Sequence, residues 1–258
     1  MISELLLIVS SFFAPAAVSV AAETHPPTSV VVFVDFSASI NGPARVAYRR
    51  ELETSILPFL GPGDRIMIAP IHDKTLTGFR PLAEATLPTL PQFNGFVDNT
   101  LKHAKQTKET QQTIALTRQQ LKTDVAQSFA RPLASQYTDI FSSLAMAEKY
   151  FDGDTRRRVL VLMSDMIEDN PPYKFDAMRW QPGEGDKLVA ELAAKRYIPN
   201  LSGVCVYVSG ASAPSAALAG HIGRFWQRYF ERAGADFDPA RYAHVLLHWP
   251  PSKSCRSN

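Results

Sequence analysis

An uninterrupted apolar run near the start of the chain ends in a cluster of oxygen-bearing side chains. The run is Val30–Val34, and Asp35, Ser37 and Ser39 follow it at alternate positions. A short run rich in β-branched residues is typical of a strand that is buried on both faces within a parallel sheet. Ligands of open α/β sheets bind beyond the carboxyl ends of the strands, so the Asp-x-Ser-x-Ser turn lies where a binding site is expected. Carboxylate and hydroxyl oxygens are hard donors, which suit Mg²⁺, Mn²⁺ or Ca²⁺ better than Zn²⁺.

Two later segments support a metal site, although Asp and Ser in one turn could also be purely structural. Thr138 stands at the start of a helical pattern of apolar residues. A second short apolar run, Val159–Met163, ends in Ser164 and Asp165. The sequence therefore places oxygen donors at the ends of two predicted strands and at the start of one predicted helix.

These segments, with the strand-like Gly63–Ile71 as a fourth, resemble the von Willebrand factor A (vWA) domain over roughly residues 29–248. In that family the three oxygen-bearing segments form the metal-ion-dependent adhesion site (MIDAS). The resemblance implies a divalent cation, Mg²⁺ first, with Mn²⁺ and Ca²⁺ as alternatives. It implies that hydroxyls and carboxylates bind the metal directly or through water, and the residues concerned are Asp35, Ser37, Ser39, Thr138 and Asp165.

Each of these residues also has a structural alternative. Thr138 could cap its helix, and Asp165 could be a strand-end carboxylate that accepts hydrogen bonds from turn amides. Glu168 and Asp169 follow the second strand and could tune the charge of the site, but a solvated loop is the default expectation.

The alternation of strand-like and helical patterns predicts a doubly wound α/β fold, with a mostly parallel central sheet flanked by helices. The predicted division of the chain is a signal peptide at 1–22, a linker at 23–28, the vWA domain at 29–249 and a C-terminal tail at 250–258. A helical insertion at about 92–131 is polar in its middle and apolar at its ends. It is either a solvated surface helix or a partner-binding arm beside the metal site.

Several local elements are also predicted. A helix begins near Pro43, with Val46, Ile56 and Leu57 in its buried stripe. We expect an edge strand over 75–82 and a last strand over 242–249. A helix predicted near the C-terminal end of the chain carries four aromatic residues, and their spacing indicates core packing rather than ligand stacking. They are Phe225, Trp226, Tyr229 and Phe230.

The first residues indicate export. Leu5–Ala22 is apolar apart from serines and ends in small residues, which is typical of a signal peptide. The residues before it include Glu4 and no Lys or Arg, so an uncleaved membrane anchor is the alternative. We expect an exported protein of bacterial type that is periplasmic or secreted. If the segment is not cleaved, we expect a membrane-anchored protein instead.

Two cysteines, Cys205 and Cys255, lack the spacing of a metal site. They are either two unrelated thiols or a disulfide, which an exported chain would favour.

The expected function is protein binding through the metal, whose open coordination position would take an Asp or Glu of the partner. A formal net charge of +2 argues against binding to nucleic acid, and contact with a membrane is expected only if the first segment stays uncleaved. A metal-independent scaffold that uses the insertion is the alternative. A metal-dependent hydrolase with His72 as base is less favoured, because the chain lacks a nucleophile elbow or a phosphate-binding glycine loop. We therefore do not expect an enzyme.

Overall fold

The computed structural model describes residues 25–73, 78–96, 99–131 and 135–252. Its centre is a six-stranded sheet in the order β3-β2-β1-β4-β5-β6. Every neighbouring pair is parallel except β2 and β3, which are antiparallel. The strands are β1 (Thr28–Asp35), β2 (Arg65–Ile71), β3 (Ala83–Thr86), β4 (Arg157–Met163), β5 (Val204–Ser209) and β6 (Asp236–Ala243). The strand order reverses beside β1, which makes the ends of β1 and β4 the topological switch point.

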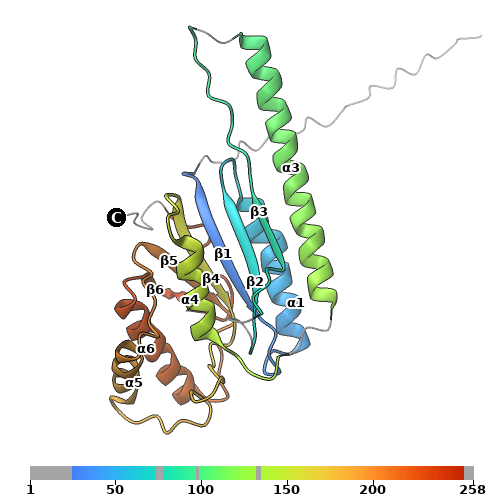
Figure 1. The fold of residues 1–258 in the computed structure, drawn as a ribbon. Helices are drawn as coiled ribbons and strands as arrows, with labels where there is room; N and C mark the ends of the chain where they lie inside the picture. The colour runs from blue at the N-terminus through green and yellow to red at the C-terminus, as the bar shows by residue number, and fades with distance from the viewer. Residues whose placement is uncertain (1–24, 74–77, 97–98, 132–134, 253–258) are drawn as a thin grey trace, which may run out of the picture.

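Helices cover both faces of the sheet (Figure 1). One core contains residues of α1, the π-helical turn and α3, and the other contains residues of α4, α5 and α6. The helices are α1 (Gly42–Glu51), the π-helical turn (Leu52–Ile56), α2 (Leu57–Phe59), α3 (Thr100–Ala130), α4 (Ile140–Phe151), α5 (Glu184–Ala194) and α6 (Ala216–Arg232). The predicted doubly wound α/β fold with a long helical insertion is confirmed.

Strand β1 joins the two cores. All eight of its residues are buried. Val30 and Val32 belong to the core beneath α1, whereas Val31 and Phe33 belong to the core beneath α4 and α6. The period of two in a strand explains how one continuous apolar run serves both faces.

Three local predictions differ from the structure. Val46 is 68% exposed, because Tyr48, Leu52 and Ile56 face the sheet and the π-helical turn resets the helical stripe. The edge strand begins at Ala83, later than predicted, and residues 74–77 lie outside the described part.

The last strand, β6, is also earlier than predicted. It pairs Cys205 with Asp236 and ends at Ala243, so the predicted range of 242–249 is wrong. An edge strand bonds to a neighbour on one side only and tolerates Pro239 and the acidic residues that hide its pattern in the sequence.

The insertion forms one long helix rather than two. Helix α3 has 31 residues, which corresponds to about 46 Å. Its buried residues all lie from Ile114 onward, and Figure 1 shows its first half projecting beyond the sheet. Strand β3 runs antiparallel to β2 and returns the chain to the end where β1 and β2 begin, so α3 starts there. The projecting half is therefore at the end opposite the predicted metal site, not beside it.

Some predictions fall on residues that the structure does not describe. The predicted signal peptide at 1–22 and Cys255 lie outside the described residues. Cys205 is buried in β5 and is disulfide-bonded. Within the described residues, no helix combines the length and the apolar character that crossing a membrane requires.

A buried aspartate fixes the starts of β1 and β2 relative to each other. Asp64 is fully buried, and its carboxylate accepts hydrogen bonds from the backbone N–H of Thr28 at 2.7 Å and of Gly61 at 2.6 Å. Burial raises the pKa of Asp64, and the two amide bonds oppose that rise.

Replacing Asp64 should therefore be costly. Asp64→Ala leaves two buried N–H groups without an acceptor, and we expect a loss of about 2–4 kcal/mol in the free energy of unfolding, measured in urea. Glu84→Ala is the control, because Glu84 makes an exposed ion pair with Arg65 that should contribute less than about 1 kcal/mol. Equal losses in the two variants would contradict this role for Asp64.

Candidate metal centre

The candidate site lies where β1 and β4 end. Asp35 is the last residue of β1, and Val34 pairs with Met163, so Ser164 comes to lie beside Asp35. The Ser164 hydroxyl donates to Asp35 Oδ2 at 2.7 Å. The other oxygen, Asp35 Oδ1, accepts from the backbone N–H of Ser37 at 2.8 Å and closes the turn that follows the strand.

A chain of contacts links four of the five predicted ligands. The hydroxyl oxygens of Ser37 and Ser39 lie 3.1 Å apart. The Ser39 hydroxyl in turn hydrogen-bonds to the carboxylate of Asp165. Asp35 is fully buried and Ser39 is exposed, so the cluster opens to solvent at the serine turn.

Thr138 reaches the same edge through the backbone. Its carbonyl accepts from the N–H of Asp169 at 3.1 Å, and nearby Ser135 forms a bridge with Ser37. The residue that caps α4 is Asp139, whose carboxylate accepts from the N–H of Ser142 at 3.0 Å. The helix-cap alternative for Thr138 is therefore wrong. Within the described part of the chain, the Thr138 hydroxyl makes no hydrogen bond, and none joins it to the other four residues.

The two acidic side chains of the site form a buried pair of like charge. Burial raises the pKa of Asp35, although hydrogen bonds from Ser37 and Ser164 and the charge of Arg45 act against that rise. Burial and then the negative charge of Asp35 raise the pKa of Asp165 to about 6. The ion pairs among the described residues include neither carboxylate. A divalent cation bound between hydroxyls and carboxylates would relieve this repulsion, so the donors fit the predicted metal.

The five predicted ligands differ from a metal site made of imidazoles and thiolates. In the described part of the chain, no group of three or more His, Cys, Asp or Glu residues could hold a metal ion. The predicted set has two carboxylates and three hydroxyls, so it depends on the neutral oxygens to complete the coordination.

The sequence interpretation missed two residues that organise the site. Ser164 links the end of β1 to the loop after β4. Its hydroxyl donates to Asp35 and also accepts from the N–H of Met166 at 3.0 Å. Arg45 in α1 donates to the carbonyls of Phe36 at 3.0 Å and Ser37 at 3.3 Å, which holds the serine turn. Ser164 was visible beside Asp165 in the sequence, but an arginine on the next helix gives no comparable pattern.

Glu168 corrects the expectation of a solvated loop. It is fully buried, and its carboxylate accepts from the N–H groups of Ile140 at 2.8 Å and Phe141 at 3.3 Å. Burial and then the charge of Asp139 raise the pKa of Glu168 well above its usual range. Glu168 and Asp139 together satisfy the first amides of α4, which fixes the segment that carries Thr138.

The loop after β4 has a strained backbone. Met166 has a φ of 66°, in the left-handed region that residues other than glycine rarely adopt, and its side chain is fully buried. Its carbonyl accepts from the indole N–H of Trp226 at 2.8 Å. The predicted core role of the aromatic residues in α6 is confirmed, and Trp226 also holds the loop that presents Asp165.

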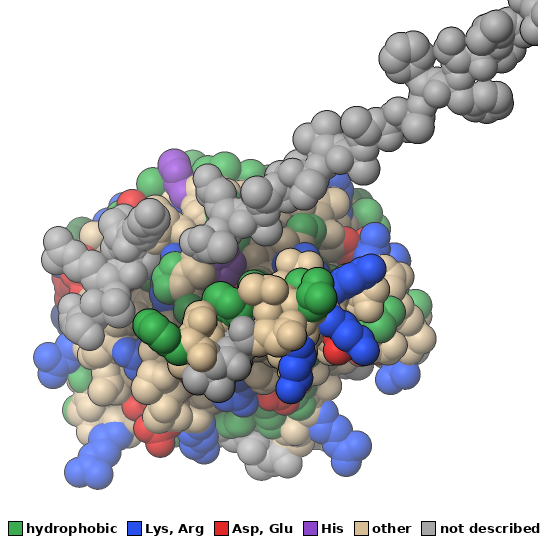
Figure 2. All heavy atoms as spheres, turned by 90° about the horizontal axis from the view of Figure 1, so that it is seen from above, with side chains coloured by type: hydrophobic (Ala, Val, Ile, Leu, Met, Phe, Trp, Pro, Cys, Tyr) green, Lys and Arg blue, Asp and Glu red, His purple; other side chains and the backbone are tan. Residues whose placement is uncertain are grey.

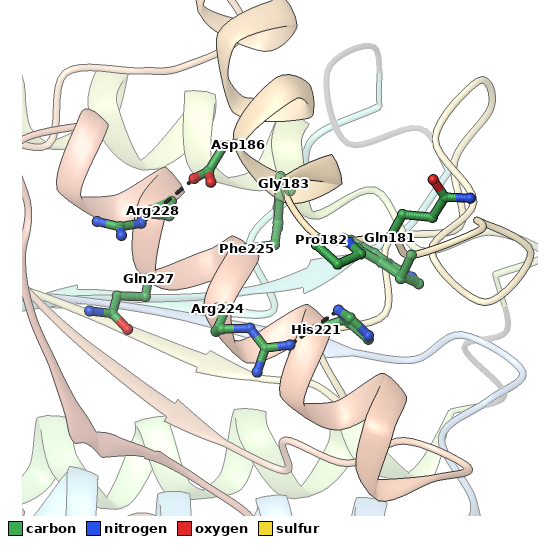
Figure 3. Close-up of a pocket in the computed structure, with 11 residues that line it drawn as sticks. Gln181, Pro182, Gly183, Asp186, His221, Arg224, Phe225, Gln227 and Arg228 are labelled. Atoms are coloured by element: carbon green, nitrogen blue, oxygen red, sulfur yellow. Dashed lines mark hydrogen bonds and ion pairs between the residues drawn. The ribbon is translucent and has the colours of Figure 1, made fainter.

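Two hollows lie against the helices, and they differ in their position relative to the candidate metal centre. A hollow of about 370 Å³ lies between the start of α5 and the middle of α6 (Figure 3). Its arginines already have partners: Arg228 pairs with Asp186 at 3.6 Å and Glu231 at 3.0 Å, and Arg224 donates to His221 at 3.1 Å. This hollow includes none of the five predicted ligands.

A second hollow, of about 360 Å³, adjoins the start of α4. Aromatic side chains and acidic groups line it, among them Phe141, Tyr173, Tyr197, Asp139 and Glu148. This hollow also includes none of the five predicted ligands, but Asp139, which directly follows Thr138, is one of its lining residues.

Comparisons with known proteins give weak structural likenesses. No protein-family model and no curated protein sequence matches the chain. The fold is similar to the conserved hypothetical protein BatB from Bacteroides thetaiotaomicron, with 12% identity and a TM-score of 0.38, over 78% of this chain and 87% of that chain. It is also similar to the manganese-loaded TRAP protein of Plasmodium vivax, with 12% identity and a TM-score of 0.31, over 77% of this chain and 63% of that chain. Likenesses this low assign neither a family nor a ligand to the chain.

The buried acidic pair should destabilise the metal-free protein above pH 6. The pKa of Asp165 is about 6 in the folded state against an ordinary 3.8, so the folded protein binds this proton more tightly than the unfolded chain does. Stability should therefore fall as the pH rises from about 4 to 6, and the loss should persist at higher pH.

Removing the charge of Asp165 should restore the stability that is lost at high pH. In chelator at pH 8, Asp165→Asn should raise the free energy of unfolding by about 1–3 kcal/mol, and the gain should vanish near pH 4. The control Asp152→Asn removes an exposed carboxylate just after the end of α4, and we expect a change of less than about 1 kcal/mol. A destabilised Asp165→Asn variant at pH 8 would refute the repulsion.

Proposed function

We propose that this protein is an exported vWA-type domain that binds a protein partner through a divalent metal at Asp35, Ser37, Ser39, Thr138 and Asp165. The observation that carries the proposal is the buried pair of carboxylates, which lacks an ion-pair partner among the described residues and adjoins the buried Ser37 and the exposed Ser39. An arrangement of this kind is costly for stability and is expected where a cation completes it.

The residue types suit a site that leaves positive charge for a ligand. Three neutral hydroxyls do not neutralise a divalent cation, and two carboxylates do so only in part when water separates them from it. Bound Mg²⁺, or Mn²⁺ or Ca²⁺ as alternatives, would supply an electrophilic position for a carboxylate of the partner. An Asp or Glu on the partner would then be its anchor residue.

The hollow beside Thr138 supports a protein ligand. Its lining of Phe141, Tyr173 and Tyr197 offers apolar contact to residues that flank the anchor carboxylate. Contacts of this kind would add affinity and distinguish one acidic partner from another.

Hydrolysis is not part of the proposal. His72 follows β2 at the same edge, but a base beside the site does not by itself make a reaction. The metal-independent scaffold remains the alternative that the next experiment separates from the proposal.

Metal binding should stabilise the fold. At about a hundred times its dissociation constant, Mg²⁺ or Mn²⁺ should add roughly 2.7 kcal/mol, which corresponds to about 5–11 °C in a thermal melt of the full chain. Asp35→Asn and Thr138→Ala should lose the shift. Ser142→Ala is the matched control, because it removes another hydroxyl at the start of α4 and should keep the shift. A shift retained by Asp35→Asn would place the metal elsewhere, and an unshifted wild type would favour the metal-independent scaffold.

An open coordination position should be detectable with a simple carboxylate. Protein-bound Mn²⁺ enhances the relaxation of water protons, and acetate that displaces bound water should lower this enhancement. The same acetate concentrations with free Mn²⁺ serve as the control. An enhancement that acetate leaves unchanged would contradict carboxylate capture while leaving metal binding intact.

A further inference from the structure

The projecting end of α3 exposes large apolar side chains. Phe96 is fully exposed, Leu101 is 81% exposed and Phe93 is 48% exposed. The Phe93 ring packs edge-on against His103, with 5.0 Å between the ring centroids, which holds it beside the helix. A soluble surface rarely gathers such side chains in one place unless they contact something. We call Phe93, Phe96, Leu101 and the lysines described next the α3 tip.

Three lysines follow these apolar residues in the chain. Lys102, Lys105 and Lys108 are all exposed on the first turns of α3. Among the described residues from 91 to 110, Glu109 is the sole acid, and it pairs loosely with Lys105 at 3.9 Å; Asp98 lies outside the described residues. Figure 2, which looks down on this end of the molecule, shows basic side chains beside hydrophobic ones.

The α3 tip lies at the end of the molecule where β1 begins. Its helix has no buried residue before Ile114, so the first turns stand clear of the domain (Figure 1). The chain enters the sheet at this same end, because β1 begins there at Thr28. The candidate metal centre lies at the opposite ends of the strands.

We propose that the α3 tip binds the surface of an anionic lipid membrane. The apolar side chains would enter the boundary between headgroups and acyl chains, and the lysines would face the lipid phosphates. A standard protein–protein interface takes roughly 20–30 residues from each partner, many more than the three apolar side chains of the tip. A bilayer surface deforms around such a tip, so shape complementarity is not needed.

Binding through the α3 tip would orient the domain relative to the membrane. With the α3 tip on the membrane, the candidate metal centre at the other end of the sheet faces away from the lipid. The proposal depends on neither the metal nor the fate of the first 22 residues, because the tip would reach the bilayer from an anchored or a released chain.

The test places a reporter at the tip of the full chain. Phe96→Trp adds a tryptophan just before α3, and the control Leu116→Trp adds one within α3. Leu116 is 71% exposed and lies after the first buried position of the helix. Their emission is compared, after subtraction of wild type, on vesicles that contain brominated phosphatidylcholine with and without phosphatidylglycerol. Far-UV circular dichroism checks that both variants fold.

We expect the Phe96→Trp emission to shift to shorter wavelength and to be quenched by the brominated lipid when phosphatidylglycerol is present. The Leu116→Trp emission should stay unchanged. Adding Lys102→Gln, Lys105→Gln and Lys108→Gln to Phe96→Trp should remove most of the quenching, since each lysine near the surface contributes roughly fivefold to binding.

Three results would overturn the proposal. The first is Phe96→Trp emission that vesicles do not change, even if the chain sediments with them through its first residues. The second is equal quenching with and without phosphatidylglycerol. The third is a shift that depends on protein concentration without vesicles, which would indicate contact with a second copy of the chain.

Discussion

The burial of Asp35 at the end of a strand with no exposed face is the constraint on which the site depends. A carboxylate removed from water needs partners, and Asp35 finds them in the N–H of Ser37 and the hydroxyl of Ser164. The first bond sets the shape of the serine turn, and the second fixes the start of the loop that carries Asp165. The two loops are thereby locked to each other although they are far apart in the sequence. What these bonds leave uncompensated is charge, which is why a cation is the simplest occupant.

The opposite wall of the site is rigid for a different reason. Helix α4 starts at the site, and its first amides are satisfied by two carboxylates, Asp139 from its own chain segment and Glu168 from the loop after β4. Because Glu168 reaches from that loop to α4, it ties the Asp165 loop to the segment that carries Thr138. Trp226 adds a third support at the carbonyl of Met166. The strained backbone at Met166 can persist because its surroundings hold it from several sides.

The sequence was most informative where burial was complete. The run Val30–Val34 predicted a central strand, and the aromatic residues of α6 predicted a core face. Both patterns follow directly from which faces of the strand or helix are buried. It was least informative at edges: β6 contains Pro239 and acidic residues, and an edge strand needs no apolar run. Glu168 was placed in solvent because an acid in a loop gives no sign that two distant amides will bury it. The five predicted ligands come to one edge. Only the fold could show that Asp139 takes the capping role and that the Thr138 hydroxyl makes no hydrogen bond to another described residue.

The short antiparallel strand β3 separates the tip of α3 from the candidate metal centre. A parallel crossover would have started the insertion at the metal edge, whereas β3 returns the chain to the other end of the sheet before α3 begins. Helix α3 then runs back along the domain, and its last turns pack Phe129 against Phe36 beside the serine turn. One helix therefore contacts the base of the candidate metal centre at its C-terminus and carries an apolar, basic tip at its N-terminus. A domain built in this way has its apolar, basic tip and its candidate metal centre at opposite ends, with helix α3 running from one to the other.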